Sequence, residues 1–300
     1  MRIVLFAAAA LLMSFTFGQS LSPRLASIVP PDATFVRSIN LERYADSALH
    51  SFYPTTQEST ALCLGKVRQI ITAERAPAAG GGRLVILRGA NVASVCASPE
   101  PTSDIAPASA SNLTVLEAGT AITGDPDTVQ LALDRWQQRG SEVDGDLGEK
   151  IRTMSESYDN WLIAFRPLRA MVEGQPSGPY QSYRSQFTDM VEEVRAGVRL
   201  GKINEIELDL EMQTSEDATA AAGLGRWLRG LVQTRGGTEA ALAEVAGGWS
   251  VTTTGKVVSL FFTLDSTKLL EIDEKRRAME KAAVKDDGDP PTETTIVKKH

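Results

Sequence analysis

The sequence predicts an α+β protein made of two degenerate repeats, each a mostly antiparallel sheet with helices packed on one face. This expectation rests on alternating apolar and polar residues, which are typical of half-buried strands, and on apolar residues at helical spacing. The two kinds of segment follow a similar order in both halves of the chain. The clearest strand is 203–212, where Ile206, Leu208 and Leu210 alternate with acidic residues.

The composition is that of a globular protein, and it limits the available chemistry. Of the 300 residues, 42% are hydrophobic and 23% are charged, and 38 acidic against 31 basic residues leave a net charge of −7. This acidic balance argues against a nucleic-acid partner. His50, His300 and two cysteines supply too few soft ligands for a usual zinc, copper or iron–sulfur site, so we expect no cofactor.

The first twenty residues have the pattern of a signal peptide. Arg2 precedes an apolar or small run over 3–17, and Gly18 and Ser20 offer small residues for cleavage. We therefore expect residues 1–20 to be removed and the protein to be periplasmic or secreted. The alternative is an uncleaved leader that tethers it to the inner membrane. No later segment is long and apolar enough to span a bilayer, so no stable span is expected after cleavage.

The two cysteines, Cys63 and Cys96, fit an exported protein, because thiols in an oxidising compartment tend to pair. We predict a disulfide between them, which on the chain-entropy model stabilises the fold by about 3 to 4 kcal/mol. Two separate buried thiols are the alternative, because spacing alone does not show that the Cβ atoms meet. A catalytic thiol is disfavoured, because neither cysteine has a CxxC partner.

The first repeat is assigned to residues 27–140. Its predicted strands are 34–41, 83–88 and a bent or paired strand over 113–123, and its predicted helices are 42–52, 60–73 and 126–138. The last helix has the clearest start in the chain. Asp125 is placed to cap it, and Pro126 occupies the first helical position.

The second repeat is assigned to residues 150–283, after a Gly-rich and acidic boundary over 140–148. Its predicted strands are 160–165, 203–212 and a hairpin of 249–254 with 257–264, and its principal predicted helices are 183–199, 215–232 and one that begins at 265. The charged tail, 284–300, is predicted to be disordered.

Several motifs support a duplication and a relationship to other proteins. Each half has a helix with an Arg-Trp pair, Arg135-Trp136 and Arg226-Trp227. Together with the leader and the closing hairpin, Pro-Pro-Asp-Ala over 30–33 and Gly-Asp-Pro-Asp-Thr-Val over 124–129 resemble uncharacterised exported bacterial proteins of unknown function. The resemblance lies in structural motifs and implies no catalytic residues.

An acidic row on one face of strand 203–212 is the most concentrated charge of the predicted fold. It consists of Glu205, Glu207, Asp209 and Glu211, and neighbouring carboxylates on one strand face lie about 6.5 to 7 Å apart. Such a row could bind Ca²⁺ or a basic partner. Because Ca²⁺ takes oxygens that converge around a point, and a straight strand presents carboxylates in parallel, a solvated sheet face is favoured and no metal ligand is assigned.

Other motifs give no site. Gly80-Gly81-Gly82 precedes a strand, whereas a phosphate-binding loop follows one. Gly124 and Asp125 open a helix, but the aspartates there would repel an anion. His50 has no Gly-x-Ser-x-Gly motif to act with. The four tryptophans are predicted to be core residues.

Together these observations favour a non-enzymatic, exported binding or scaffold protein of the cell envelope. Its partner is expected to be an unknown protein or envelope component, and no catalytic residue is assigned. The alternative is a carboxylate-based hydrolase acting in the periplasm, which requires at least two acidic side chains brought together in a cleft.

Overall fold

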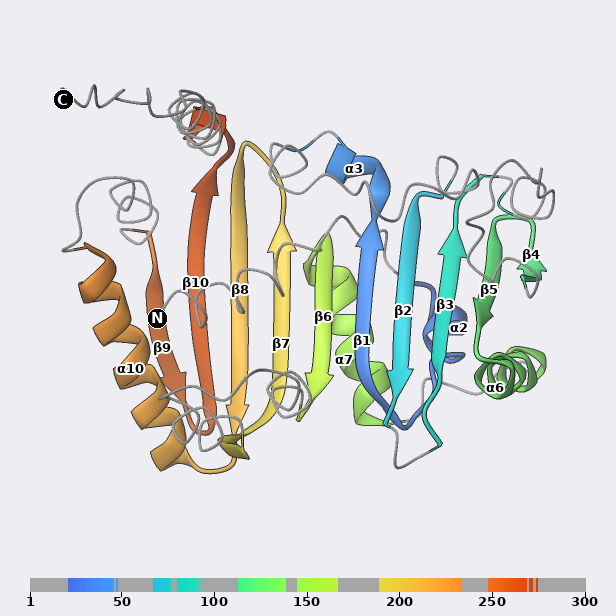
Figure 1. The fold of residues 1–300 in the computed structure, drawn as a ribbon, viewed down its shortest axis with the longest axis horizontal. Coiled ribbons are helices and arrows are strands. Elements are labelled where there is room, and N and C mark those ends of the chain that lie inside the picture. Colours follow the sequence, from blue (N-terminus) through green and yellow to red (C-terminus); the bar gives the residue numbers. More distant parts are fainter. Residues whose placement is uncertain are drawn as a thin grey trace, which may run out of the picture.

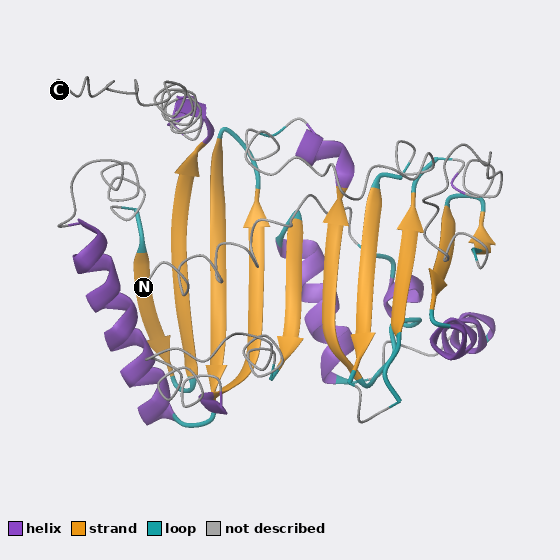
Figure 2. Ribbon diagram, viewed as in Figure 1, coloured by secondary structure: helices purple, strands orange, loops and turns teal. Residues whose placement is uncertain are grey.

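The sheet that dominates the molecule has ten strands, and every neighbouring pair is antiparallel (Figure 1). Helices lie on both of its faces (Figure 2). The fold is therefore of the α+β class that the sequence predicts. Of the 300 residues, the computed structural model describes 21–45, 47, 67–76, 80–90, 92, 113–138, 145–166, 189–233, 248–268, 270–271 and 274.

Five strands come from the first half of the chain. They are β1 (Ala33–Asn40), β2 (Gln69–Arg75), β3 (Arg83–Arg88), β4 (Thr114–Glu117) and β5 (Thr120–Gly124). The described residues of this half also form helices α2 (Pro23–Ala26), α3 (Leu41–Ala45) and α6 (Pro126–Gln137). The paired strand predicted over 113–123 is confirmed as the β4–β5 hairpin. Helix α6 begins at Pro126, as predicted. The Asp125 carboxylate does not cap the helix, because it accepts a hydrogen bond from the backbone N–H of Arg83 instead.

Five more strands come from the second half. They are β6 (Asn160–Phe165), β7 (Val191–Arg199), β8 (Ile203–Met212), β9 (Ser250–Thr254) and β10 (Val257–Asp265). Among the described residues of this half, the long helices are α7 (Asp146–Ser157) and α10 (Ser215–Gln233). The predicted strands 160–165 and 203–212 and the closing hairpin are confirmed.

The two halves meet where β1 pairs with β6 in the middle of the sheet. Outward from this junction the strand order is β1, β2, β3, β5, β4 on one side and β6, β7, β8, β10, β9 on the other. The order of strands is thus the same in both halves. The predicted correspondence of the Arg-Trp helices is wrong, because α6 follows the fifth strand of its half and α10 follows the third. The boundaries 27–140 and 150–283 stay a prediction.

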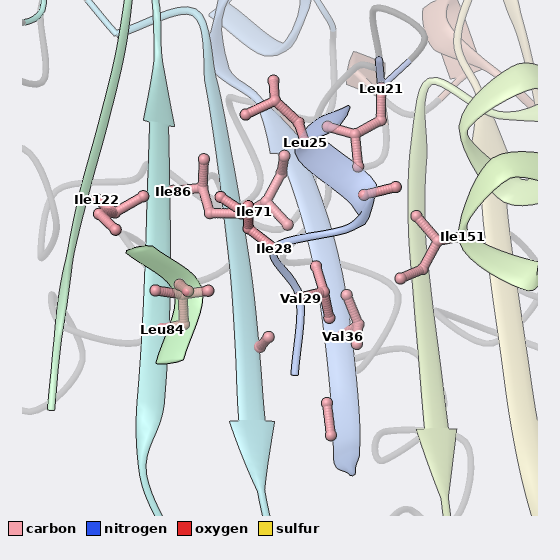
Figure 3. Close-up of a cluster of buried hydrophobic side chains, with 14 of the residues drawn as sticks. Leu21, Leu25, Ile28, Val29, Val36, Ile71, Leu84, Ile86, Ile122 and Ile151 are labelled. Carbon is pink, nitrogen blue, oxygen red and sulfur yellow. The ribbon is translucent and has the colours of Figure 1, made fainter. Parts of the chain in front are cut away.

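Each face of the sheet has its own hydrophobic core. On the face that we call the α7 face, α2, α6 and α7 cover a cluster that includes Val36, Ile86 and Trp161, and residues from both halves contribute to it (Figure 3). On the opposite α10 face, Ala218 and Ala222 of α10 belong to a second cluster that includes Val194 and Val258. Helices within the second half therefore occupy both faces, whereas the sequence predicts one.

Two predicted helices are wrong over described residues, where strands β2 and β7 take their place. The helix expected over 60–73 overlaps β2, and the one expected over 183–199 overlaps β7. Strand β2 lies near the middle of the sheet and is buried on both faces, so its apolar run has no period of two to reveal it. In β7 a register shift between Val191 and Glu193 brings Val191 into the same core as Val194, and this spacing imitates a helix.

Helix α7 is a long helix that the sequence does not predict. It begins after Gly145, inside the segment interpreted as a boundary, and its Gly148 is buried. Ile151 and Met154 form its contact with the α7-face core. The glycine and acidic residues in its first turn are typical of a loop, so the short apolar face does not stand out in the sequence.

Several predictions fall outside the described residues. These are the leader 1–20, Cys63 and Cys96 with their disulfide, His50, and the tail 284–300. Among the helices that the structure describes, none combines the length and hydrophobicity needed to cross a bilayer.

Candidate functional site

The acidic row lies on β8, on the α7 face of the sheet. Its four carboxylates alternate with Ile206, Leu208, Leu210 and Met212, which belong to the core of the α10 face, as the sequence predicts. Helix α7 packs over β6 and β7, and the described helix that packs on β8, β9 and β10 is α10, on the opposite face. The acidic row therefore lies beside α7 on a part of the sheet that is polar and partly exposed.

Strand β7 places a different partner opposite each member of the row. The register pairs Glu205 with Arg199, Glu207 with Gly197, Asp209 with Arg195, and Glu211 with Glu193. We call these eight residues, together with Tyr158, Lys150 and Ser259, the polar sheet face. Most of the acidic row is thus ordered by specific neighbours and is more than a solvated strand face.

Tyr158 follows α7, and its side chain lies over Gly197 of β7. Its ring occupies the space where Gly197 has no side chain, since a Cβ atom on Gly197 would overlap ring atoms Cγ, Cδ1 and Cδ2. An aromatic ring over a strand glycine fills the gap in the sheet surface. The Arg199 guanidinium lies 4.9 Å from the centre of the same ring, within the range of a cation–π contact.

The Tyr158 hydroxyl donates a hydrogen bond of 2.6 Å to Glu207 Oε2. Burial of the phenol, followed by its contact with the Glu207 carboxylate, raises the pKa of Tyr158 above its ordinary value. Arg199 continues the network by donating to Glu205 Oε2 at 3.0 Å and to the Ser157 carbonyl at 2.7 Å. The C-terminal end of α7 is therefore fixed to β7 and β8 by polar contacts.

Asp209 lies in the middle of the row. It accepts a 2.6 Å hydrogen bond from Ser259 Oγ on β10, and Arg195 Nη2 lies 3.9 Å from its Oδ2. Burial raises the pKa of Asp209, and the Ser259 hydrogen bond and the Arg195 charge oppose this rise only in part.

Lys150 connects α7 to the far end of β7. Its Nζ lies 2.5 Å from both Asp146 Oδ2 and Glu193 Oε2, and the Glu193 side chain is only 4% exposed. Burial alone would lower the pKa of Lys150, but the hydrogen bonds to Asp146 and Glu193 outweigh it and raise the pKa. Arg195 Nε, 3.3 Å from Glu193 Oε1, adds a second cation.

Glu211 differs from the other three acidic residues. It faces the Glu193 carboxylate across the strand pair, and no cation contacts it in the part of the chain that the structure describes. Like charges directly opposite each other are unfavourable on a sheet. The polar sheet face therefore carries an excess of negative charge, which is located at Glu211. Its five carboxylates belong to Glu193 and the acidic row, and its three cations are Lys150, Arg195 and Arg199.

The sequence predicts the acidic row but not its neighbours. The sequence does not indicate that Arg195, Gly197 and Arg199 lie beside the acidic row, because their segment is predicted as a helix. Read as a strand, β7 alternates Glu193, Arg195, Gly197 and Arg199 with Val194, Ala196 and Val198, and that pattern would have shown the partners. Nothing in the sequence indicated that Tyr158 or Lys150 reaches this face, because α7 was not predicted.

Other predicted sites have structural roles. Gly80, Gly81 and Gly82 have positive φ values and close the β2–β3 connection, and Gly82 lies against Thr128 in the first turn of α6. Trp161 is fully buried as predicted, but Trp227 is 58% exposed on α10, so the prediction of a core role is wrong for it. Within the described ranges, no group of His, Cys, Asp and Glu side chains is arranged to hold a metal ion.

The fold and the polar sheet face together define a mixed α+β protein with a large antiparallel sheet. No family model matches the chain, and no curated protein matches its sequence. It has a weak structural resemblance to the Treponema protein TP0453. Crystal forms I, III and IV of that protein give TM-scores of 0.42, 0.48 and 0.46, each at 8% identity, and cover 85%, 85% and 82% of this chain and 98%, 99% and 95% of theirs.

Proposed function

We propose that the protein is an exported, non-enzymatic binding protein whose polar sheet face receives a cationic segment of another protein. The observation that carries the proposal is Glu211, which is partly exposed and lies opposite Glu193, and which no cation of the described residues contacts. A lysine or arginine of a partner placed there would relieve the repulsion between the two carboxylates. Export is supported by the leader pattern over 1–20.

The arrangement of the carboxylates supports binding over hydrolysis. A hydrolase needs an acid and a base that converge on one bond. Here the carboxylates of Glu205, Glu207, Asp209 and Glu211 project side by side from one strand, with neighbours about 6.5 to 7 Å apart. Glu205 and Glu207 are already bonded to Arg199 and Tyr158. The same parallel row suits a partner strand or chain with cations at regular intervals.

Titration with a fluorescently labelled ten-residue oligolysine tests the proposal. The full chain is expected to bind the peptide at low ionic strength and to bind it less well as salt rises, because exposed charges are screened. An oligoglutamate of the same length is the ligand control. Glu211→Gln is expected to weaken oligolysine binding several-fold. Glu216→Gln removes an equal charge from α10 on the opposite face and is expected to leave binding unchanged.

Equal loss of affinity in Glu211→Gln and Glu216→Gln would mean that oligolysine responds only to net charge, and the proposed surface would then be wrong. Absence of oligolysine binding at low salt would exclude a cationic partner for this face.

A further inference from the structure

The two edges of the sheet are built differently. Strand β4 is four residues long, has an irregular register between Val115 and Glu117, and ends in a charged residue. Short length, irregularity and charge are the usual means by which an edge strand resists pairing with another chain. Strand β9, with the sequence Ser-Val-Thr-Thr-Thr, has no charge and no proline, and its pairing with β10 is regular. Only the β9 edge is therefore suited to accept another strand.

The hairpin shows which groups of β9 point outward. Its loop is Gly255-Lys256, and Thr254 pairs with Val257 to close it. The closing pair of a two-residue hairpin exchanges both hydrogen bonds, and bonded and non-bonded pairs then alternate along the ladder. The N–H and C=O groups of Val251 and Thr253 consequently point away from β10. In the described part of the chain neither residue makes a further backbone hydrogen bond.

Side chains leave this edge open. Four of the five β9 residues are exposed, and the fifth, Val251, is half-buried under Gly225 of α10. Helix α10 runs along the same edge of the sheet (Figure 1). Its exposed side includes Gly223 and Gly230, and Trp227, which is 58% exposed, lies between them at helical spacing. A Cβ atom added to either glycine would meet nothing within 4 Å, so no described residue covers this side of α10 at the two glycines.

We propose that β9 is a dimerisation edge, which pairs antiparallel with β9 of a second copy about a two-fold axis at Thr252, with α10 beside α10 on one face. In this register Val251 exchanges two backbone hydrogen bonds with Thr253 of the second copy, and Thr253 does the same with Val251 of the second copy. The outward N–H and C=O groups of both residues are then all paired. The strand is complementary to itself, because no like charges meet. The blunted β4 edge closes the assembly at two copies. This inference is independent of the proposed cationic partner.

Substitution of Thr253 tests the pairing. Thr253→Pro removes an N–H that points outward, so the β9–β10 hairpin keeps its hydrogen bonds, as prolines on edge strands usually allow. Sedimentation equilibrium of the full chain is expected to show a dimer, and Thr253→Pro is expected to raise its dissociation constant at least about tenfold. A monomeric parent chain at all concentrations, or a folded Thr253→Pro protein that dimerises as tightly as the parent, would overturn the proposal.

Cross-linking tests the register separately. Two copies of Thr252→Cys would have Cα atoms about 4.5 Å apart in a non-hydrogen-bonded pair, which suits a disulfide. Ser250→Cys is the matched control, since it lies on the same strand and face but faces Thr254 of the second copy, about 13 Å from its own equivalent. Mild oxidation is expected to link Thr252→Cys and neither Ser250→Cys nor the parent chain. Equal linking of the two variants would contradict the two-fold axis at Thr252.

Discussion

The ring of Tyr158 lies against the bare Cα of Gly197, and this contact joins the end of α7 to the centre of β7. Gly197→Ala places a methyl group inside the ring and must displace it, so we expect a loss of at least about 2 kcal/mol in the free energy of unfolding. Urea denaturation followed by circular dichroism measures this loss.

Two variants make the explanation specific. Gly201→Ala is the control, because a Cβ atom there has Ile203 O as its nearest neighbour at 3.4 Å, and little change is expected. Gly197→Ala combined with Tyr158→Ala removes the ring, so the two effects should be strongly non-additive. Additive losses would show that the ring and Gly197 do not restrict each other.

Tyr158→Phe keeps the ring and removes its hydrogen bond to Glu207. We expect a loss of about 1 to 2 kcal/mol in the free energy of unfolding at neutral pH, because the acceptor is charged and the site is half-buried. The alkaline range gives a second readout. Because the pKa of Tyr158 is raised on folding, the unfolded chain loses the phenolic proton first, and stability should fall as pH rises above 10.0, the ordinary pKa of the phenol.

Absorbance at 295 nm during alkaline titration checks this directly. Tyr158 should ionise later than it does in the unfolded chain, and Tyr158→Phe should reduce the amplitude of the late step by one tyrosine. A late step of unchanged amplitude in Tyr158→Phe would show that it belongs to other tyrosines.

Lys150→Met leaves the buried Glu193 carboxylate with Arg195 as its remaining cation. Breaking a buried ion pair from one side is costly, and we expect a loss of about 3 kcal/mol, at the lower end of the usual range because Arg195 stays in place. Thermal or urea unfolding measures it. Adding Glu193→Gln should recover most of the loss, and a double variant as unstable as Lys150→Met would refute the ion-pair explanation.

The buried carboxyl of Asp209 makes stability depend on acid pH. Its pKa is raised on folding, so the native state binds a proton before the unfolded chain does, and acidification through that range removes the cost of burying the charge. The parent chain should therefore gain stability relative to Asp209→Asn as pH falls from 7 to 4. Unfolding free energies of both proteins over that range test this, and a constant difference would contradict it.

The sequence predicts correctly those elements that bury one face only, because their apolar and polar residues then alternate at the spacing of a strand or a helix. In β8 the alternation of Ile206, Leu208 and Leu210 with acids is complete, because the α7 side of this strand is polar. The start of α6 follows from Pro126 and from Gly124, whose φ of 144° favours glycine. Such local chemistry does not depend on distant neighbours.

The missed elements depend on those neighbours. Strand β2 is buried on both faces, because Ile71 packs in the core of the α7 face and Ile70 packs with Val67 and Val92 in a separate cluster. Strand β7 has helical spacing only because of its register shift. The acidic row could be predicted, but its partners could not, since Lys150 and Tyr158 reach it from α7. Sequence reasoning thus finds the charges of the polar sheet face and not their neutralisation.

The position of bound oligolysine tests the central claim most directly. Amide chemical shifts of the isotopically labelled full chain, recorded during the titration, should change mainly at Glu207, Asp209 and Glu211 of β8 and at Ser259 of β10, and the α10 amides should be unaffected. Shift changes concentrated on α10, or spread evenly over the surface, would contradict the assignment of the polar sheet face as the binding surface.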